Sequence, residues 1–361
     1  MSADTLAGDV VRTRPEADAL EREPLVILEP LEAFLDAAGL GAGPVEATPI
    51  GDGHSNVTYL LRRGELRVVL RRPPRGPLPA SAHDVLREAR LLTALRPVGV
   101  RVPEVLAVCD DPEVIGAPFY VMGYLDGLVL STRLAAVFDE RRHRERIGAE
   151  LVDALVELHA VDIDAAGLDG LGRRGGYLER QVRRFSGLLE VNATRPLPAL
   201  ERVAGWLEHN RPEQAETTIV HGDFRLGNAM FAPEAPPRIV GILDWELATL
   251  GDPLADVGYL TAMWAVPEDP PNPMLDLSAV TRLPGFLDRE ALARRYERAT
   301  GRPIEALPWY QVLALWKAAI FLEGSYKRYL AGSTDDPYFA RLGEGVPVLG
   351  DMAWALAQRW A

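Results

Sequence analysis

Cysteine is almost absent from this sequence of 361 residues, which contains one, Cys109. A single thiol excludes an internal disulfide and a metal site built from several cysteines. We expect Cys109 to be a small buried residue on a strand. Long apolar runs are missing as well. The best one near the C-terminus, "VLALWKAAIFL", is interrupted by Lys317 and is too short to cross a bilayer.

Lysine is nearly as scarce, with only Lys317 and Lys327, so arginine supplies almost all of the positive charge. The net charge is -13. Such a chain is not expected to bind nucleic acid or an anionic membrane as its main partner, because both attract basic surfaces. A small phosphorylated ligand remains compatible, since it needs only a local positive site. The first twenty residues have no apolar segment typical of a secretory signal, so we expect a cytoplasmic protein.

The composition, 48% hydrophobic and 25% charged, is typical of a globular protein, and the length allows two lobes with separate cores. Residues 1–24 are predicted to form a flexible tail. Residues 25–123 predict a β-rich N-lobe, with three strands, one long helix capped by Ser81, and two further strands. Residues 124–361 predict a helical C-lobe that contains one β-rich interval. Its helices are expected at about 138–160, 175–190, 196–209, 289–300, 309–331 and 337–359. The fold class is α+β.

The β-rich interval contains "VHGDFRLGNAM", in which "HGDFRLG" connects two short strand-like runs. A third strand, "RIVGILD", ends at Asp244. A hairpin here would bring Asp223, Asn228 and Asp244 to the same end of a small sheet. Two carboxylates and an amide oxygen suit Mg²⁺, and a carboxylate can also accept a proton from a hydroxyl group. A single "HGD" is more often a polar turn, and it is the joint spacing that favours a site.

This spacing resembles the kinase catalytic loop, in which an Asp is followed five residues later by an Asn. With "ILDWE" and "GDPLADVGYL", the set is similar to the aminoglycoside phosphotransferase and choline kinase-like family of small-molecule kinases. The resemblance runs from about residue 45 to 330. Within it, "LRRPP", "SAHDVLREARLLTAL" and "YLERQVRRF" are similar to a branch also found fused to acyl-CoA dehydrogenases. The resemblance implies a protein kinase-like two-lobed fold that uses ATP and Mg²⁺.

The resemblance also implies roles for the residues of the loop. Asp223 would be the catalytic base, and His221 would brace the loop through hydrogen bonds. Arg225 lies in the same loop and is a further catalytic candidate. Asn228 and Asp244 would hold the Mg²⁺ that bridges the ATP phosphates.

Three further residues are expected to have structural roles. Asp256 would be a buried acid that accepts backbone N–H groups of the loop. His159 should be structural, packed under the loop. Asp252 before Pro253 predicts the start of a helix from capping preferences alone.

The nucleotide half of the site is predicted in the N-lobe. In "GDGHSNVTYLL" the turn residues Gly53, Ser55 and Asn56 could approach phosphate, although a plain hairpin would look the same. In "PFYVMGYLDG" the residues Met122 and Tyr124 are the expected adenine contacts. An ordinary buried strand is the alternative reading of that segment.

Arginine replaces the phosphate-binding lysine that the resemblance leads one to expect on the third strand. Arg71 occupies the matching position, and no lysine precedes residue 317. Arginine could keep the ion pair, because it is permanently charged and binds oxygen atoms bidentately. Glu88 lies within the apolar stripe of the following helix, so pairing with Arg71 is expected; a glutamate that reaches solvent is the alternative.

The acceptor is the least defined part of the reaction. The branch resemblance suggests a hydroxyacyl or acyl-CoA compound, with an aminoglycoside as the alternative substrate. A non-catalytic module that binds a nucleotide or metabolite is the alternative function, since Arg71 departs from the kinase pattern. Residues that could line an acceptor cleft, or simply pack, are Arg225, Tyr259, Trp264, Trp316 and Tyr326. Arginines that could bind CoA, or form a solvated helix face, are Arg173, Arg174, Arg180, Arg183 and Arg184.

Overall fold

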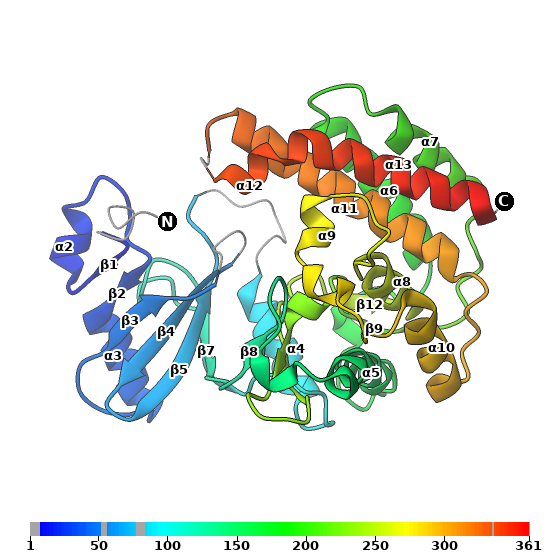
Figure 1. The fold of residues 1–361 in the computed structure, drawn as a ribbon. Helices are drawn as coiled ribbons and strands as arrows, with labels where there is room; N and C mark the ends of the chain where they lie inside the picture. Colours follow the sequence, from blue (N-terminus) through cyan, green and yellow to red (C-terminus); the bar gives the residue numbers. More distant parts are fainter. Residues whose placement is uncertain (1–7, 52–55, 77–83, 334–335, 361) are drawn as a thin grey trace. The chain divides into compact units, whose positions relative to one another are not determined.

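The computed structural model describes residues 8–51, 56–76, 84–333 and 336–360 (Figure 1). The chain forms two compact units. The first contains residues 1–97 and 102–125, and the second contains residues 98–101 and 126–361. Within the described ranges, no helix is both long and apolar enough to cross a bilayer.

The first unit is built on one antiparallel sheet with the strand order β3-β4-β5-β7-β6. Helix α4 (Val85–Leu95) follows β5 in the chain and packs against β6 and β7. This arrangement confirms the predicted meander, long helix and two further strands. Cys109 is buried at the end of β6, as expected. The strands are β3 (Glu46–Pro49), β4 (Val57–Arg63), β5 (Leu66–Arg72), β6 (Val105–Cys109) and β7 (Phe119–Gly123).

Helix α4 is capped by a different residue from the one predicted. The carboxylate of Asp84 accepts the Arg87 N–H at 2.9 Å, which makes Asp84 the N-cap. The predicted cap, Ser81, lies outside the described residues. Serine and aspartate are nearly equivalent as caps, so composition alone did not distinguish the two positions.

Residues 8–24 are ordered, contrary to the predicted flexible tail. Strand β1 (Val10–Val11) pairs in parallel with β2 (Val26–Ile27), and a capping box starts α2 (Arg14–Asp18). The Asp9 carboxylate contacts Arg22 at 2.7 Å and Arg75 at 2.6 Å. The prediction failed because this segment is held by ion pairs and by a two-residue strand, neither of which gives a periodic pattern. Helix α3 (Leu28–Ala37) follows β2, and its buried side chains, Leu31 and Leu35, belong to the hydrophobic core of the first unit.

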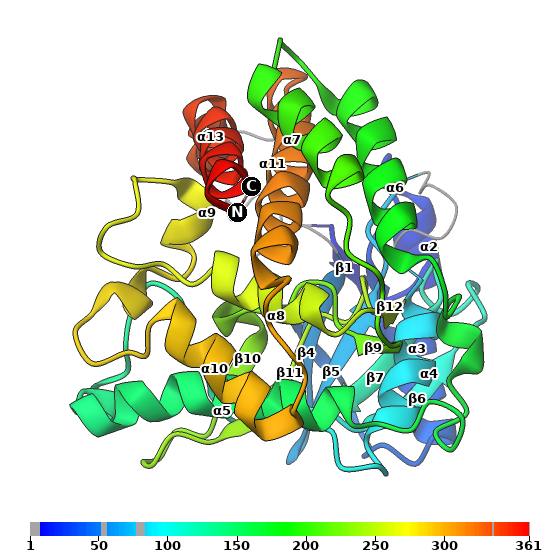
Figure 2. The same ribbon diagram turned by 90° about the vertical axis from the view of Figure 1, so that its right-hand side faces the viewer.

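The second unit is mainly helical. Helix α11 packs against α6, α7, α8 and α13, and α13 runs beside it in both views (Figures 1 and 2). The helices are α5 (Arg141–His159), α6 (Tyr177–Asn192), α7 (Pro198–His209), α8 (Leu254–Ala262), α9 (Pro273–Asp276), α10 (Arg289–Thr300), α11 (Leu307–Leu330), α12 (Pro337–Ala340) and α13 (Leu342–Trp360). The long helices confirm the predicted ones, except that the last is divided into α12 and α13.

The β-rich interval of this unit forms two small sheets, not the single hairpin sheet that was predicted. One has the strand order β11-β10-β8, and the other pairs β12 with β9. Strand β9 therefore pairs with β12, a strand that the sequence pattern does not predict, and not with β10. The strands are β8 (Leu128–Val129), β9 (Thr218–Val220), β10 (Ala229–Phe231), β11 (Ile239–Ile242) and β12 (Thr249–Gly251).

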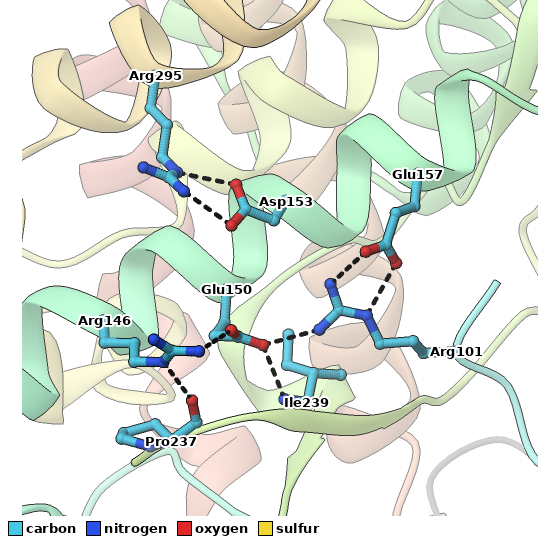
Figure 3. A network of polar contacts seen from close by, with 8 residues as sticks. All are labelled: Arg101, Arg146, Glu150, Asp153, Glu157, Pro237, Ile239 and Arg295. Atoms are coloured by element: carbon cyan, nitrogen blue, oxygen red, sulfur yellow. Dashed lines mark hydrogen bonds and ion pairs between the residues drawn. The ribbon is translucent and has the colours of Figure 1, made fainter. Parts of the chain in front are cut away.

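Charged side chains tie α5 to neighbouring segments of the same unit (Figure 3). Glu150 receives hydrogen bonds from Arg101 at 2.8 Å, from Arg146 at 3.2 Å and from the Ile239 N–H at 3.1 Å. Arg101 also binds both oxygens of Glu157, at 2.8 and 2.7 Å. The two glutamates differ in exposure, because the Glu150 side chain is 10% exposed and that of Glu157 is 43% exposed.

Glu150→Ala should therefore destabilise the fold by roughly 2 to 3 kcal/mol, since the buried Ile239 N–H loses its acceptor and Arg101 keeps only Glu157 as a charged partner. The matched control Glu157→Ala should cost no more than about 1 kcal/mol, as for exposed pairs. Urea denaturation of both variants measures the two free energies of unfolding. Equal losses would show that burial of Glu150 does not determine the strength of this network.

Candidate active site

The loop from His221 to Asn228 lies between β9 and β10, and hydrogen bonds to Asp256 on α8 hold it in place. The Asp256 carboxylate is fully buried and accepts the N–H groups of His221 at 2.6 Å and Gly222 at 2.8 Å. His159 Nε2 lies 3.3 Å from the same carboxylate. These contacts confirm the supporting positions predicted for Asp256 and His159. Gly222 has φ of 86°, a conformation that favours glycine.

Helix α8 begins one residue later than predicted. The N-cap position is Pro253, where Asp252 was predicted, and it carries no side-chain cap bond. Asp252 accepts the Leu254 N–H at 3.0 Å from just before the helix. This start places Asp256 in the first turn of α8, where its carboxylate meets the loop.

The charge of Asp256 makes the stability of the folded protein depend on pH. Burial raises the pKa of this carboxyl, but the bond and charge of His159, with the charge and N–H of His221, outweigh burial and leave the pKa lowered. A lowered folded-state pKa contributes stability above the unfolded pKa, near 4, and this contribution is lost as the pH falls through the folded value.

Asp256→Asn should therefore destabilise the protein by roughly 3 kcal/mol at pH 7, because the loop loses charge-assisted bonds. The difference between wild type and variant should shrink below about pH 4. Asp252→Asn is the matched control, because burial raises the pKa of Asp252 and its contribution changes with pH in the opposite direction. Urea denaturation between pH 3 and 7 tests both variants. A constant difference for Asp256→Asn would contradict this explanation.

His221 braces the loop from inside. Its Nε2 lies 2.9 Å from the Leu243 carbonyl, and its Nδ1 lies 3.3 Å from the Asp223 N–H. These partners fit a ring that donates from Nε2 and accepts at Nδ1. The ring packs on Trp245 at 4.6 Å between centroids. The predicted bracing contacts are therefore present.

Asp223 is held by its neighbours in the loop. Asn228 Nδ2 donates to the Asp223 carbonyl and to Asp223 Oδ2, both at 2.8 Å. The other carboxylate oxygen, Oδ1, is buried and accepts no hydrogen bond within the described residues, although Arg225 Nε lies 3.6 Å away. A buried carboxylate oxygen without a donor is costly and suits a site that receives a ligand proton.

Arg225 and Tyr259 share this charged environment. Burial would lower the pKa of Arg225, but the carboxylates of Asp223 and Asp244 raise it, so the guanidinium stays charged. Burial raises the pKa of Tyr259 well above its usual value, and Asp223 adds to the shift. Both side chains therefore lie close to the carboxylates of the loop.

Asp244 follows β11 in a strained conformation. Its φ is 66°, and no other non-glycine residue in the described ranges has a positive φ. The preceding residue ties this turn to the loop, because the Leu243 N–H donates to the Asn228 carbonyl at 2.8 Å. Strained conformations of this kind cluster at functional sites, and aspartate tolerates this one better than most residues.

The donor set fits a magnesium ion. The Asn228 amide nitrogen faces Asp223, so its amide oxygen is the atom that could coordinate a cation. Asp244 supplies a carboxylate in a turn joined to the same loop. Across the described residues, no group of three or more His, Cys, Asp or Glu side chains could hold a metal. A site here therefore depends on few protein ligands, as Mg²⁺ sites with bound phosphate usually do.

In the first unit, the predicted pair between Arg71 and Glu88 is formed. Arg71 Nε lies 2.9 Å from Glu88 Oε2, and the two side chains are 13% and 3% exposed. Arg72, on the other face of β5, is also buried, and it binds the carbonyls of Leu25 and Ile115. Burial lowers the pKa of Arg72 to about 10. The two adjacent arginines thus have different environments, and only Arg71 pairs with the glutamate of α4.

The other predicted nucleotide contacts are less well defined. Gly53 and Ser55 lie outside the described residues, and Asn56 is buried just before β4. The backbone of Met122 lies within the sheet, paired with Val69 and Val105. Tyr124 follows the end of β7, and the Arg67 guanidinium lies 4.6 Å from its ring centroid.

The candidates for acceptor contacts separate into two groups. Trp264 and Trp316 are fully buried and donate to the carbonyls of Leu287 and Leu200, so they pack in the core. Tyr326 stacks on Tyr329. Arg225 and Tyr259 alone among the five lie beside Asp223.

The predicted arginine cluster is largely committed to local contacts. Arg174 contacts Asp164 and Asp169. Arg180 binds backbone carbonyls, and Arg183 pairs with Glu179 in the preceding turn of α6. Arg184 differs, because its guanidinium lies beside the Phe185 ring. A solvated helix face therefore describes most of this cluster.

The family description "phosphotransferase enzyme family" matches residues 46–313 of the chain. The chain belongs to this family. It is 37% identical to mouse acyl-CoA dehydrogenase family member 10 over 320 residues, which is 88% of this chain and 30% of that protein. A crystal structure of a candidate aminoglycoside phosphotransferase from Ralstonia eutropha JMP134 is 31% identical, with a TM-score of 0.78, over 92% of this chain and 98% of the other.

A more distant solved structure confirms the protein kinase-like fold. A thermostable mutant of aminoglycoside phosphotransferase APH(4)-Ia, in complex with AMP-PNP and hygromycin B, is 15% identical, with a TM-score of 0.58, over 90% of this chain and 98% of the other. The phosphotransferase chain spans less than half the length of the first curated relatives, 30% to 41% of each. The family match confirms the family resemblance, and the likeness in structure confirms the two-lobed α+β fold class predicted from sequence.

Proposed function

We propose that this phosphotransferase transfers the γ-phosphoryl group of ATP to a hydroxyl group of a small molecule, with Mg²⁺. The observation that carries this proposal is the Asp223 carboxylate, which is held by Asn228 while one buried oxygen accepts no hydrogen bond within the described residues. Asp223 accepts the proton of the acceptor hydroxyl. The hydroxyl oxygen then bonds to the γ-phosphorus as the bond from phosphorus to the departing ADP oxygen breaks.

The surrounding residues position this proton acceptor. His221 and Asp256 fix the backbone of the loop, and Arg225 holds the side chain of Asp223 through its charge. Asn228 and Asp244 would hold Mg²⁺, which when bound neutralises the phosphate charge that develops during transfer. In the first unit, Arg71 would bind phosphate oxygens while paired with Glu88. Asn56, Met122 and Tyr124 remain proposed nucleotide contacts.

For the acceptor, we propose a hydroxyacyl or acyl-CoA compound. The acyl-CoA dehydrogenase relatives that contain a similar region favour this class over aminoglycosides. A screen for ADP release should include hydroxyacyl-CoAs, hydroxy acids, amino alcohols, sugars and aminoglycosides. Turnover of an aminoglycoside alone would contradict the proposed acceptor class.

The binding-module alternative rests on Arg71, which replaces the expected lysine. It predicts that Mg²⁺-ATP raises the melting temperature while no acceptor in the same screen releases ADP. The kinase proposal predicts both the stabilisation and the release. The two proposals therefore differ in whether an acceptor causes ADP release.

A further inference from the structure

Helix α11 contains a half-buried lysine that the proposed reaction does not use. Lys317 lies between Trp316 and Ala318, both of which are buried. It is one of only two lysines in the chain. The other, Lys327, is exposed on the same helix, and its ammonium group donates to the Val191 carbonyl at 2.6 Å.

The ammonium group of Lys317 is near a ring but forms no ion pair. Its Nζ lies 4.9 Å from the ring centroid of Phe185 on α6, and the Arg184 guanidinium lies 6.0 Å from the same ring. In the part of the chain that the structure describes, Lys317 has no hydrogen bond or carboxylate partner. An aromatic face attracts a cation, but it does not replace a counter-ion.

Lys317 lies on a helix that packs against α8, the helix whose Asp256 holds the loop from His221 to Asn228. Helix α11 packs against α6, which provides Phe185, and against α8, which provides Asp256. Burial lowers the pKa of Lys317 to about 8, and the carboxylates of Asp256 and Asp223 act in the opposite direction. The ammonium group is therefore within electrostatic reach of both acids.

Neither acid forms an ion pair with Lys317 in the described part of the chain. Asp256 is occupied by the N–H groups of His221 and Gly222. Asp223 is the proposed proton acceptor and is held by Asn228. A half-buried cation beside a reaction site, with no counter-ion of its own, is suited to bind an anionic group of a ligand.

We propose that Lys317 binds an anionic group of the acceptor, a carboxylate or a phosphate, while the acceptor hydroxyl lies at Asp223. This inference rests on the proposed kinase function and specifies the charge of its substrate. Lys317 is then a specificity-determining residue. It favours anionic hydroxyl compounds and disfavours polycations, because a like charge next to a half-buried ammonium group is repelled.

Matched acceptor pairs test the proposal in kinetic assays. Each pair keeps the hydroxylated skeleton and removes the charge: a hydroxy acid with its primary amide, and a hydroxyacyl-phosphopantetheine with the corresponding hydroxyacyl-pantetheine. The first pair tests a carboxylate and the second a phosphate. Lys317→Met should raise the KM of the anionic member about 10- to 100-fold, the range for charged hydrogen bonds, and leave the KM of the neutral member and of ATP unchanged.

Two further variants separate recognition from packing. Lys317→Arg should recover most of the affinity for the anionic acceptor, because the charge is retained. Lys327→Met, on the exposed part of the same helix, should change no KM. Equal losses for charged and neutral acceptors, or no change in Lys317→Met, would overturn the proposal and leave Lys317 a packing residue.

Absence of turnover with every acceptor would be a failure of the kinase proposal. A labelling experiment still tests the role of Lys317 in that case. Acetic anhydride modifies unprotonated lysines, and mass spectrometry can follow Lys317 with Lys327 as the internal reference. The anionic compounds of the panel should slow acetylation of Lys317 at least about 10-fold, the effect of a ligand at ten times its Kd, and the neutral partners should not. Absence of protection by every anionic compound would overturn the proposal.

Discussion

Asp223→Asn should lower kcat by about 10³-fold, within the range for loss of a general base, while nucleotide binding is retained. The substitution keeps the shape of the side chain, and its amide can still occupy the position beside Asn228. It cannot accept the hydroxyl proton. Steady-state ADP release with the best acceptor measures the loss, and the melting temperature with and without Mg²⁺-ATP measures binding.

The matched control for this variant is Asp84→Asn, which changes a helix cap in the first unit without touching the loop. It should retain nearly full kcat. If Asp223→Asn keeps more than a tenth of the wild-type kcat, Asp223 is not the proton acceptor. If it abolishes the Mg²⁺-ATP shift as well, the residue acts in binding or folding and the proposed role is wrong.

Arg71→Met should produce two separable effects. It removes the guanidinium that lies 2.9 Å from the buried Glu88 carboxylate, so we expect a loss of roughly 3 kcal/mol in the free energy of unfolding. It should also weaken nucleotide binding by about 10- to 100-fold, because a charged contact to phosphate is removed. Urea denaturation and calorimetric titration with Mg²⁺-ATP give the two quantities.

The double variant Arg71→Met/Glu88→Met separates these effects. Replacing both members of a buried pair by apolar side chains is often neutral, so stability should return while nucleotide affinity stays low. Arg71→Lys should keep most of the stability and most of the nucleotide affinity. Recovery of nucleotide affinity in the double variant would show that Arg71 serves only the fold, and would favour the non-catalytic alternative.

The sequence predicted the local structure well where a periodic pattern was long. The meander of β3, β4 and β5, the helix α4 and the long helices of the second unit all follow apolar spacing. Short elements without a repeating pattern were missed. Strand β12 has three residues, and β1 has two, and both are defined by a partner distant in the chain. Pairing of this kind depends on tertiary contacts, which propensity does not report.

The candidate site shows a similar division. The spacing of His221, Asp223 and Asn228 predicted which residues lie together, because all three are within one short loop. The ion pair between Arg71 and Glu88 was predicted from the cost of burying a lone carboxylate. Lys317 was passed over as an interruption of an apolar run. Its relation to Phe185 became visible only when α6 and α11 were packed together.

The strain at Asp244 could not be read from sequence either. A positive φ at this residue depends on the way the chain leaves β11 and returns toward β12. The amino-acid type was compatible with it, since aspartate tolerates this region better than most residues. The structure thus adds a conformational observation to the metal role that the family resemblance implied.

Transfer of labelled phosphate tests the central claim most directly. ATP labelled at the γ-phosphate is incubated with the wild-type protein, Mg²⁺ and the panel of hydroxylated acceptors, and the products are separated by mass. We predict a labelled phosphoester formed together with an equal amount of ADP, dependent on Mg²⁺ and absent with Asp223→Asn. Label found only in ATP or in inorganic phosphate, with every acceptor unchanged, would contradict the account.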